Sequence, residues 1–228
     1  MGDVDVINLV SHLIVYMVVL LLAISAHEAG HAWMSYKFGD DTARLLGRIT
    51  LNPIAHTDPI GTLLIPIAGF VIGHMSGPGV NIPLIGWGKP TPVNPLRWRS
   101  KDLANVMVSI AGILANLTIA TIALIILKVL IRAGVFSGAT TSGLAEPLWM
   151  LLTQMLLLNV SLAVFNLIPI PPLDGSKVLW TILPDSLKPA FETLERFGFL
   201  LLLVIMQTGI LNVIFTPVVN FVAFLLFL

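Results

Sequence analysis

Cysteine is absent from the 228 residues of this chain, and charged side chains are scarce. Without cysteine there can be no disulfide bond and no thiolate ligand for a metal ion. Charged residues make up 11% of the sequence, whereas soluble domains carry about 25%. The 12 basic and 12 acidic residues cancel, so net charge gives no reason to expect a nucleic-acid partner. The low charge indicates a protein that is surrounded largely by lipid.

Hydrophobic residues, by contrast, make up 57% of the chain and gather in long runs. A transmembrane helix needs about 20 mostly apolar residues. Three segments meet or approach this length, at residues 7–33, 103–130 and 149–168. We therefore expect an all-α, polytopic transmembrane bundle that forms one domain over residues 1–228, with its core at about 7–185.

The two ends of the chain need separate interpretation. The first residues, MGDVDVIN, contain no Lys or Arg, whereas a signal peptide begins with a positive region. We therefore expect the first apolar segment to be kept as a helix. The C-terminal apolar segments, within residues 197–228, are interrupted by Gln207, Thr208 and Gly209. They could form one crossing plus an interfacial helix, or a hairpin of two short helices, and the sequence favours neither.

The basic residues predict the orientation of the chain. Residues 62–73 are apolar, but these 12 residues are too few for a crossing and are typical of a re-entrant segment. If this segment dips in and returns as a hairpin, the polar segments 34–61, 86–102 and 169–196 share one side of the membrane. Because cytoplasmic loops are rich in Lys and Arg, we expect that side to be cytoplasmic, in the plasma membrane. It would hold ten of the 12 basic residues, all except Lys128 and Arg132.

The sequence HEAGH, residues 27–31, ends the first apolar segment. Residues four apart lie on one face of a helix, so His27 and His31 can offer two nitrogens to one metal ion. Glu28 lies about 100° around the helix from His27, where it can reach a metal-bound water without being a ligand. This HExxH spacing is typical of zinc metalloproteases, in which the Glu is the general base. Ionisable groups in a membrane helix are costly and usually functional, so a metal site is favoured over a pair of buried, hydrogen-bonded histidines.

A catalytic zinc site usually has three protein ligands and keeps its fourth position for water. Asp174, in the sequence NLIPIPPLDG at residues 166–175, is the best candidate for the third ligand. The prolines of this motif must break the preceding helix, and Gly175 permits an unusual backbone angle. Non-helical backbone at membrane depth must line a protein cavity. The alternative is an ordinary interfacial Asp that caps the next helix.

Five motifs occur here in the order that is seen in the site-2 protease family, which consists of intramembrane zinc metallopeptidases. They are HEAGH, LNPIAHTDPIGTLLIP (51–66), GWGKPTPVNP (86–95), AGILANL (111–117) and NLIPIPPLDG. Residues 20–180 therefore resemble a minimal prokaryotic member of this family. The chain departs from the family pattern at Ile113, where a proline usually follows AG.

The resemblance implies that His27, His31 and Asp174 bind one zinc ion and that Glu28 is the catalytic base. It also implies that Asn166 helps to stabilise the oxyanion. The expected function is cleavage of transmembrane helices near the cytoplasmic side, with a single-span membrane protein as substrate and the lipid bilayer as partner. The alternative is a metal transporter or sensor that uses the same ligands without hydrolysis. Transporters tend to show internal repeats, and this sequence shows none.

Other polar or turn-rich features have two interpretations each. Residues 80–94 are too rich in Gly and Pro for a helix, so we expect a small extended or β element near the active site. It could hold the substrate backbone as an edge strand, or it could be a plain interfacial hairpin. His56 and Asp58 could support the metal ligands from outside or stabilise a turn. Asn116 could hydrogen-bond between helices or reach the site.

Overall fold

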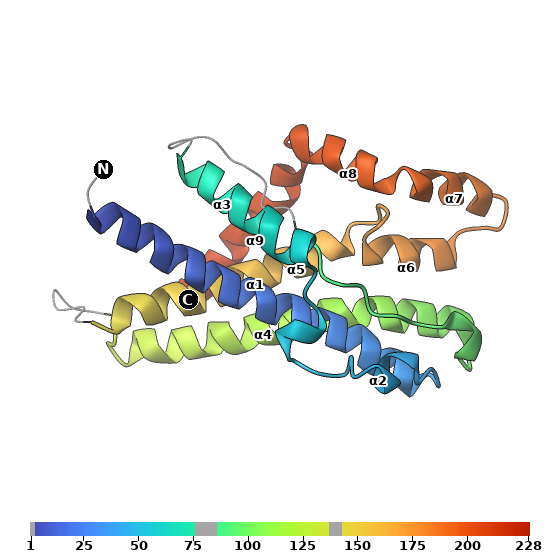
Figure 1. Cartoon of the computed structure of the whole chain (residues 1–228), viewed down its shortest axis with the longest axis horizontal. Helices are drawn as coiled ribbons and strands as arrows, with labels where there is room; N and C mark the ends of the chain where they lie inside the picture. Colours follow the sequence, from blue (N-terminus) through green and yellow to red (C-terminus); the bar gives the residue numbers. More distant parts are fainter. Residues whose placement is uncertain (1–2, 76–85, 137–142) are drawn as a thin grey trace.

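The computed structural model describes residues 3–75, 86–136 and 143–228, and every regular element in these ranges is helical (Figure 1). The three longest helices are α1 (Asp3–Lys37), α4 (Lys101–Arg132) and α5 (Ala145–Leu167). The expected all-α fold is therefore confirmed. The shorter elements are α2 (Thr42–Leu45), η1 (Pro53–Ala55), η2 (Pro59–Leu64), α3 (Ile65–Met75), η3 (Pro95–Arg97), α6 (Asp174–Ile182), α7 (Lys188–Arg196), α8 (Gly198–Gln207) and α9 (Ile210–Phe227).

Four of these helices are long and apolar enough to cross a membrane: α1 from Val6 onward, α4, α5 and α9. This confirms a polytopic bundle. At the C-terminal end, α8 has 10 residues and α9 has 18, so α9 alone of the pair is long enough to span. The two helices meet at Gly209, whose φ of 72° is one that side chains disfavour.

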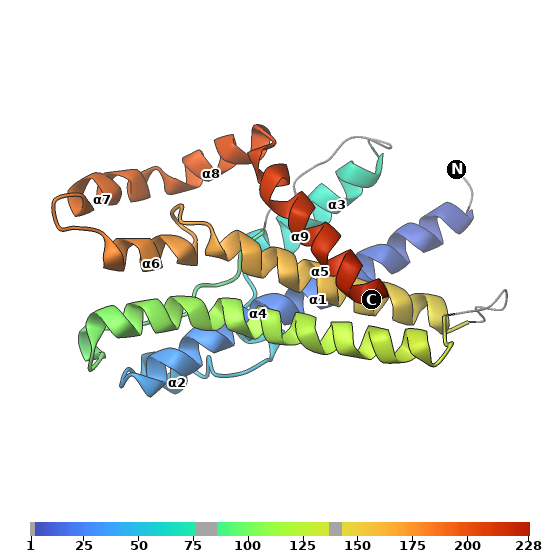
Figure 2. The same cartoon turned by 180° about the vertical axis from the view of Figure 1, so that it is seen from behind.

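Helix α4 makes the most extensive packing contacts of the described helices. It runs antiparallel to both α1 and α5 and packs against both of them (Figures 1 and 2). Within the apolar window of α4, 39% of the residues are buried, compared with 6% in α9. Helix α9 therefore packs on the outside of the bundle, where the Lys128 side chain of α4 donates to Leu225 O at 3.1 Å.

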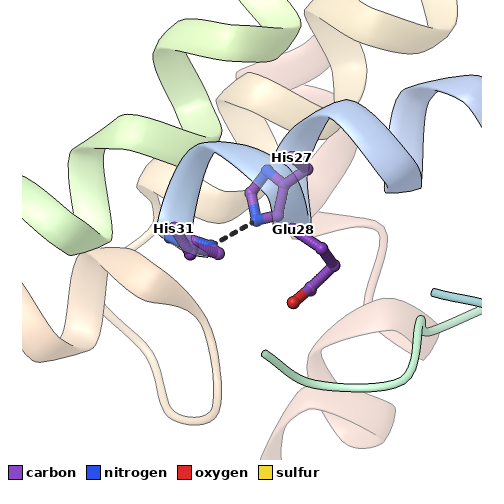
Figure 3. A group of neighbouring side chains, drawn as sticks. All are labelled: His27, Glu28 and His31. Atoms are coloured by element: carbon purple, nitrogen blue, oxygen red, sulfur yellow. Dashed lines mark hydrogen bonds between the residues drawn. The ribbon is translucent and has the colours of Figure 1, made fainter. Parts of the chain in front are cut away.

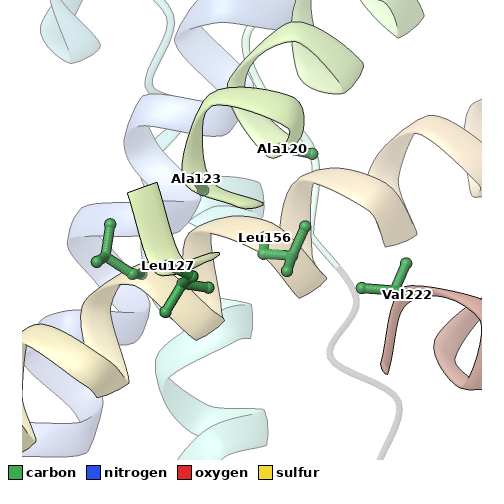
Figure 4. Packing of buried hydrophobic residues seen from close by; sticks show 6 residues of the cluster. Ala120, Ala123, Leu127, Leu156 and Val222 are labelled. Atoms are coloured by element: carbon green, nitrogen blue, oxygen red, sulfur yellow. The ribbon is translucent and has the colours of Figure 1, made fainter. Parts of the chain in front are cut away.

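Buried apolar side chains hold α4, α5 and α9 together (Figure 4). Leu127 is fully buried, and Leu156 is 2% exposed. Lipid is as apolar as these side chains, so close packing rather than transfer from water stabilises the contact. Small residues in the cluster allow α4 and α5 to approach each other. The cluster consists of Ala120, Ala123, Leu127, Leu152, Leu156 and Val222.

The apolar segment that begins at Pro59 forms η2 and α3, and α3 packs against α1 (Figure 1). Where the described chain resumes, at residues 86–88, it lies beside the start of this segment. Trp87 N donates to Gly61 O at 3.1 Å, and Thr62 Oγ1 donates to Trp87 O at 2.7 Å. This return is what a re-entrant segment requires. The hairpin itself stays a prediction, because residues 76–85 lie outside the described residues.

The expected β element is not confirmed: residues 86–94 are extended but form no strand, and residues 80–85 lie outside the described ranges. The physical reason is that the peptide groups of 86–94 bond to loops and side chains instead of to a neighbouring strand. Lys89 N, for example, donates to His56 O at 2.8 Å. Prolines at 90 and 92 also remove two donors that a ladder would need.

The polar segments gather at one end of the molecule. The C-terminal end of α1, the start of α4, and helices α2, α6 and α7 lie at the right in Figure 1, while the N-terminus and the end of α4 lie at the left. The ten basic residues of the predicted cytoplasmic side belong to segments at the right-hand end. This arrangement supports the charge argument, and which side faces the cytoplasm stays a prediction.

Single cysteines can test the orientation, because the chain has no cysteine of its own. Leu46→Cys and Leu96→Cys replace residues that are 62% and 80% exposed, and Val135→Cys replaces one that is 42% exposed at the other end. We predict that a membrane-impermeant maleimide labels the first two only from the cytoplasmic side and the third only from outside. Labelling of Leu46→Cys and Leu96→Cys from opposite sides would make residues 62–73 a true crossing.

Candidate metal centre

The HEAGH residues lie in the part of α1 that packs against α4. Helix α1 continues without a break to Lys37, so His27 and His31 lie about one turn apart on the same face. The centroids of the two rings are 4.5 Å apart and the ring planes meet at 89°. Their Nε2 atoms are 3.0 Å apart, as the dashed line in Figure 3 marks. The spacing in the sequence therefore produces two converging nitrogens.

Asp174 reaches the same point from another part of the chain. Helix α5 ends at Leu167, before the proline-rich sequence, and α6 begins at Asp174. Asp174 Oδ2 lies 3.0 Å from His27 Nε2 and 3.1 Å from His31 Nε2, and the side chain is 5% exposed. The three atoms form a nearly equilateral triangle, which we call the donor triangle.

Gly175 is needed for a reason other than the expected one. Its φ is not positive, so an unusual backbone angle does not explain it. A Cβ at this position would lie 2.3 Å from Leu167 O and 2.6 Å from Ile168 O. The glycine therefore allows the start of α6 to pack directly against the end of α5. This packing places Asp174 beside the two histidines.

The atoms of the donor triangle are electron-rich. His31 Nδ1 lies 2.6 Å from Val108 O; because a carbonyl only accepts, Nδ1 carries the hydrogen and Nε2 of the neutral ring has a lone pair. That lone pair faces Asp174 Oδ2 at 3.1 Å, so the two atoms repel unless a cation lies between them. Tetrahedral zinc, with bonds of about 2.1 Å, separates its nitrogen and oxygen ligands by about 3.4 Å. The donor triangle is close to this size, so its three residues could hold zinc.

The second oxygen of Asp174 is held by a lysine. Lys177, one turn further along α6, donates from Nζ to Asp174 Oδ1 at 2.8 Å. The ammonium charge of Lys177 favours the ionised form of this carboxyl. Asp174 is therefore a carboxylate with one oxygen on the lysine and one directed at the histidines.

Glu28 lies beside the donor triangle. Its nearest carboxylate oxygen is within 4.8 Å of the histidine nitrogens, which is farther than the 3.1 Å or less of Asp174. Glu28 Oε2 accepts a hydrogen bond from Thr91 N at 2.7 Å, and Thr91 Oγ1 donates to Glu28 O at 3.0 Å. Figure 3 shows the Glu28 side chain pointing away from the two rings. This geometry favours Asp174 over Glu28 as the third ligand, and the two roles stay predictions.

Close contact between α1 and α4 depends on glycine at position 112. A Cβ at Gly112 would lie 2.6 Å from His31 Nε2 and 2.8 Å from His27 Cε1. A Cβ at Gly30, on the α1 side, would lie 2.7 Å from Ala111 O. Glycine at positions 30 and 112 therefore permits the close approach of the helices, and Gly112 also provides the space in which the rings lie.

The remaining candidate residues make contacts of several kinds. Asn166 Nδ2 donates to Leu162 O at 3.0 Å, one turn back on its own helix, so its oxyanion role stays a prediction. His56 Nε2 donates to Thr50 O at 2.9 Å, and Asp58 Oδ1 accepts from the first amides of η2. The turn-stabilising interpretation of both residues is therefore favoured. Asn116 does reach the site, because its Oδ1 lies 2.8 Å from His27 Nδ1.

Comparison with known proteins is now informative. The sequence profile of peptidase family M50 matches residues 15–209. The chain belongs to family M50. A Bacillus subtilis (strain 168) protein named as a zinc metalloprotease, YwhC, is 37% identical over 206 residues, which cover 90% of this chain and 86% of the relative. Rip2 of Mycolicibacterium smegmatis, also named as a zinc metalloprotease, is 28% identical over 215 residues, covering 91% and 73%. No solved structure matches the chain significantly.

Membership of family M50, the site-2 protease family, confirms the resemblance that the motifs indicate. This M50 protein is a zinc metalloprotease and, with four helices able to span, a multi-pass membrane protein. The transporter alternative is accordingly not supported.

The contacts that Thr91 and Lys177 make with the site are among those that the sequence did not predict. Thr91 holds Glu28 partly through its backbone, and no sequence pattern reports a backbone donor. Lys177 was counted only as a basic residue, although its position three residues after Asp174 at the start of a helix is a readable signal.

Replacement of Gly112 tests the packing argument. Gly112→Ala should displace one or both rings and lower zinc affinity by about tenfold or more, because small misplacements of reactive groups are costly. Affinity is measured by competition with a chelator in detergent. Leu114→Ala is the matched control, since Leu114 is 49% exposed on the same helix. Unchanged affinity in Gly112→Ala would show that the rings have other space available.

Proposed function

We propose that this protein is an intramembrane endopeptidase in which His27, His31 and Asp174 hold the zinc ion and Glu28 is the general base. The donor triangle carries the proposal, because its sides of 3.0 to 3.1 Å suit one metal ion. The two nitrogens of the triangle belong to α1, and the oxygen belongs to the first residue of α6. Residues 1–228 act together as one metallopeptidase domain.

Zinc held by these residues would lower the pKa of the attacking water and polarise the peptide carbonyl. Glu28 is the group that would take the proton of that water and give it to the leaving amine as the C–N bond breaks. Thr91 N keeps Glu28 Oε2 in place at 2.7 Å, which leaves Oε1 for the proton. Asn166, near the end of α5, stabilises the oxyanion after its amide turns away from Leu162 O.

The substrate is a transmembrane helix of a membrane-anchored protein. Such a helix must first unwind, because its peptide groups are hydrogen-bonded and closed to attack. The extended residues 86–94 lie against α1 beside Glu28: a Cβ at Gly88 would lie 2.5 Å from Ile24 Cγ2 and 3.8 Å from Glu28 Cγ. We propose that carbonyl groups of this segment accept hydrogen bonds from an unwound, extended substrate, since its amides at 87, 89 and 91 are already bonded within the protein.

The active site faces the cytoplasm in the plasma membrane. His27 lies 20 residues after Ile7, or about 30 Å along the helix, which is the thickness of the hydrocarbon core. It therefore lies near the end of the bundle where the basic segments gather. Substrates are cut near that side.

Zinc content tests the ligand assignment. Purified protein should contain about one zinc ion per chain by elemental analysis. His27→Ala and Asp174→Ala should lose most of it, because two ligands hold the metal far more weakly than three. Glu28→Ala should keep its zinc, since the carboxylate lies outside the donor triangle. Zinc retained in Asp174→Ala and lost from Glu28→Ala would exchange the roles of the two acids.

Cleavage tests the base. Glu28→Gln should keep zinc but reduce the cleavage rate by about 100-fold or more, because an amide cannot accept the proton. The assay follows a single-span membrane protein in liposomes by gel electrophoresis, with and without a chelator. Glu146→Gln, at the start of α5, is the matched control and should cleave normally. Glu28→Gln cleaving at the wild-type rate, or wild type failing to cut any single-span protein, would contradict the proposal.

A further inference from the structure

The outer nitrogen of His27 meets a side chain. Nδ1 lies 2.8 Å from Oδ1 of Asn116, a residue of α4 that is fully buried. The amide nitrogen of Asn116 is 3.1 Å from Ala23 O. Because a carbonyl oxygen only accepts, this contact identifies the nitrogen end of the amide and therefore the oxygen end. His27 Nδ1 must then be the donor, which leaves a lone pair on Nε2, inside the donor triangle.

A second buried amide holds the first one. Asn159 of α5 is 1% exposed, and its Oδ1 accepts from Asn116 Nδ2 at 2.9 Å. Its own nitrogen donates to Met155 O at 2.8 Å, which likewise identifies its ends. The two amides form a chain of hydrogen bonds that runs from α5 through α4 to the ring on α1. Both hydrogens of the Asn116 amide are used, so its orientation is fixed.

We propose that Asn116, braced by Asn159, is a positioning residue that holds His27 in the tautomer and ring orientation needed for zinc. This inference rests on the proposed ligand role of His27. Metal-binding histidines commonly donate their other nitrogen to an acceptor, which fixes the tautomer and strengthens the ligand. His31 uses a main-chain carbonyl, Val108 O, for the same purpose. Of the two rings, His27 therefore has the acceptor that a substitution can remove.

The simpler alternative is that the two asparagines only join helices, which buried amides often do in membranes. The two ideas differ in what they require of Asn116. Joining helices needs any pair of polar groups, whereas positioning needs an acceptor at Oδ1. Asn116→Leu removes that acceptor and keeps the volume. Asn116→Asp keeps the acceptor at Oδ1 and nearly the same shape.

Zinc affinity of full-length protein in detergent, from competition with a chelator, gives the first readout. Asn116→Leu should weaken zinc binding by roughly 10- to 100-fold, and Asn116→Asp should restore it to within a few-fold of wild type. Asn159→Leu should give a smaller loss. Ser109→Ala, a buried residue of α4 that bonds to Asn105 O, is the matched control and should bind as wild type does. Equal affinity in wild type and Asn116→Leu, or equal losses in Asn116→Leu and Asn116→Asp, would overturn the inference.

A second readout uses the wild-type protein, so it does not depend on whether variants at position 116 fold. In zinc-loaded wild type labelled with ¹⁵N-histidine, the signals of His27 are identified by their loss in His27→Ala. The expected spectrum shows a protonated Nδ1 and a metal-bound Nε2. A protonated Nε2, or zinc on Nδ1, would overturn the inference. Wild type that binds no zinc would instead contradict the proposed function, so the two failures can be told apart.

Discussion

The close crossing of α1 and α4 is the constraint on which the rest of the site depends. Glycine at 30 and 112 lets the backbones meet, since a Cβ at either position would overlap the facing helix. The crossing also brings Val108 O and Asn116 within hydrogen-bond reach of the two rings. In lipid, polar groups must find partners within the protein. One packing contact therefore supplies both the space in which the two rings lie and the acceptors that orient them.

Parts of the site that lie farther from this crossing are held by less helix packing. Helices α1, α4 and α5 pack along their lengths, while α8 packs on α9, on α7 and on the loop before α6. Residues 86–94 are held by separate hydrogen bonds at Gly61, His56 and Glu28 instead of by a ladder. The proposed metal ligands thus lie on helices, whereas the extended chain beside Glu28 is held by bonds that can open one at a time.

Much of the site could be predicted because it depends on local rules. Helical periodicity places His27 and His31 together, and the prolines after Leu167 predict a helix break before Asp174. The role of Asn159 could not be predicted, since it depends on the register of α5 against α4, which no local pattern reports. The sequence suggests an unusual backbone angle at Gly175, whereas the structure shows that the residue must be glycine because a Cβ would overlap Leu167 O. Both requirements select glycine, so the sequence alone does not distinguish them. The β element is not confirmed in the described residues, because an extended sequence does not specify a partner strand.

Two of the groups that orient the site, Thr91 N and Val108 O, belong to the main chain. Any amino acid supplies a carbonyl, and any except proline supplies an amide hydrogen. Mutation can therefore replace the side chains at 91 and 108 while these two bonds persist, provided that the backbone path is kept. Natural selection at such positions acts on chain geometry, and related proteins can differ there in sequence while sharing the same chemistry.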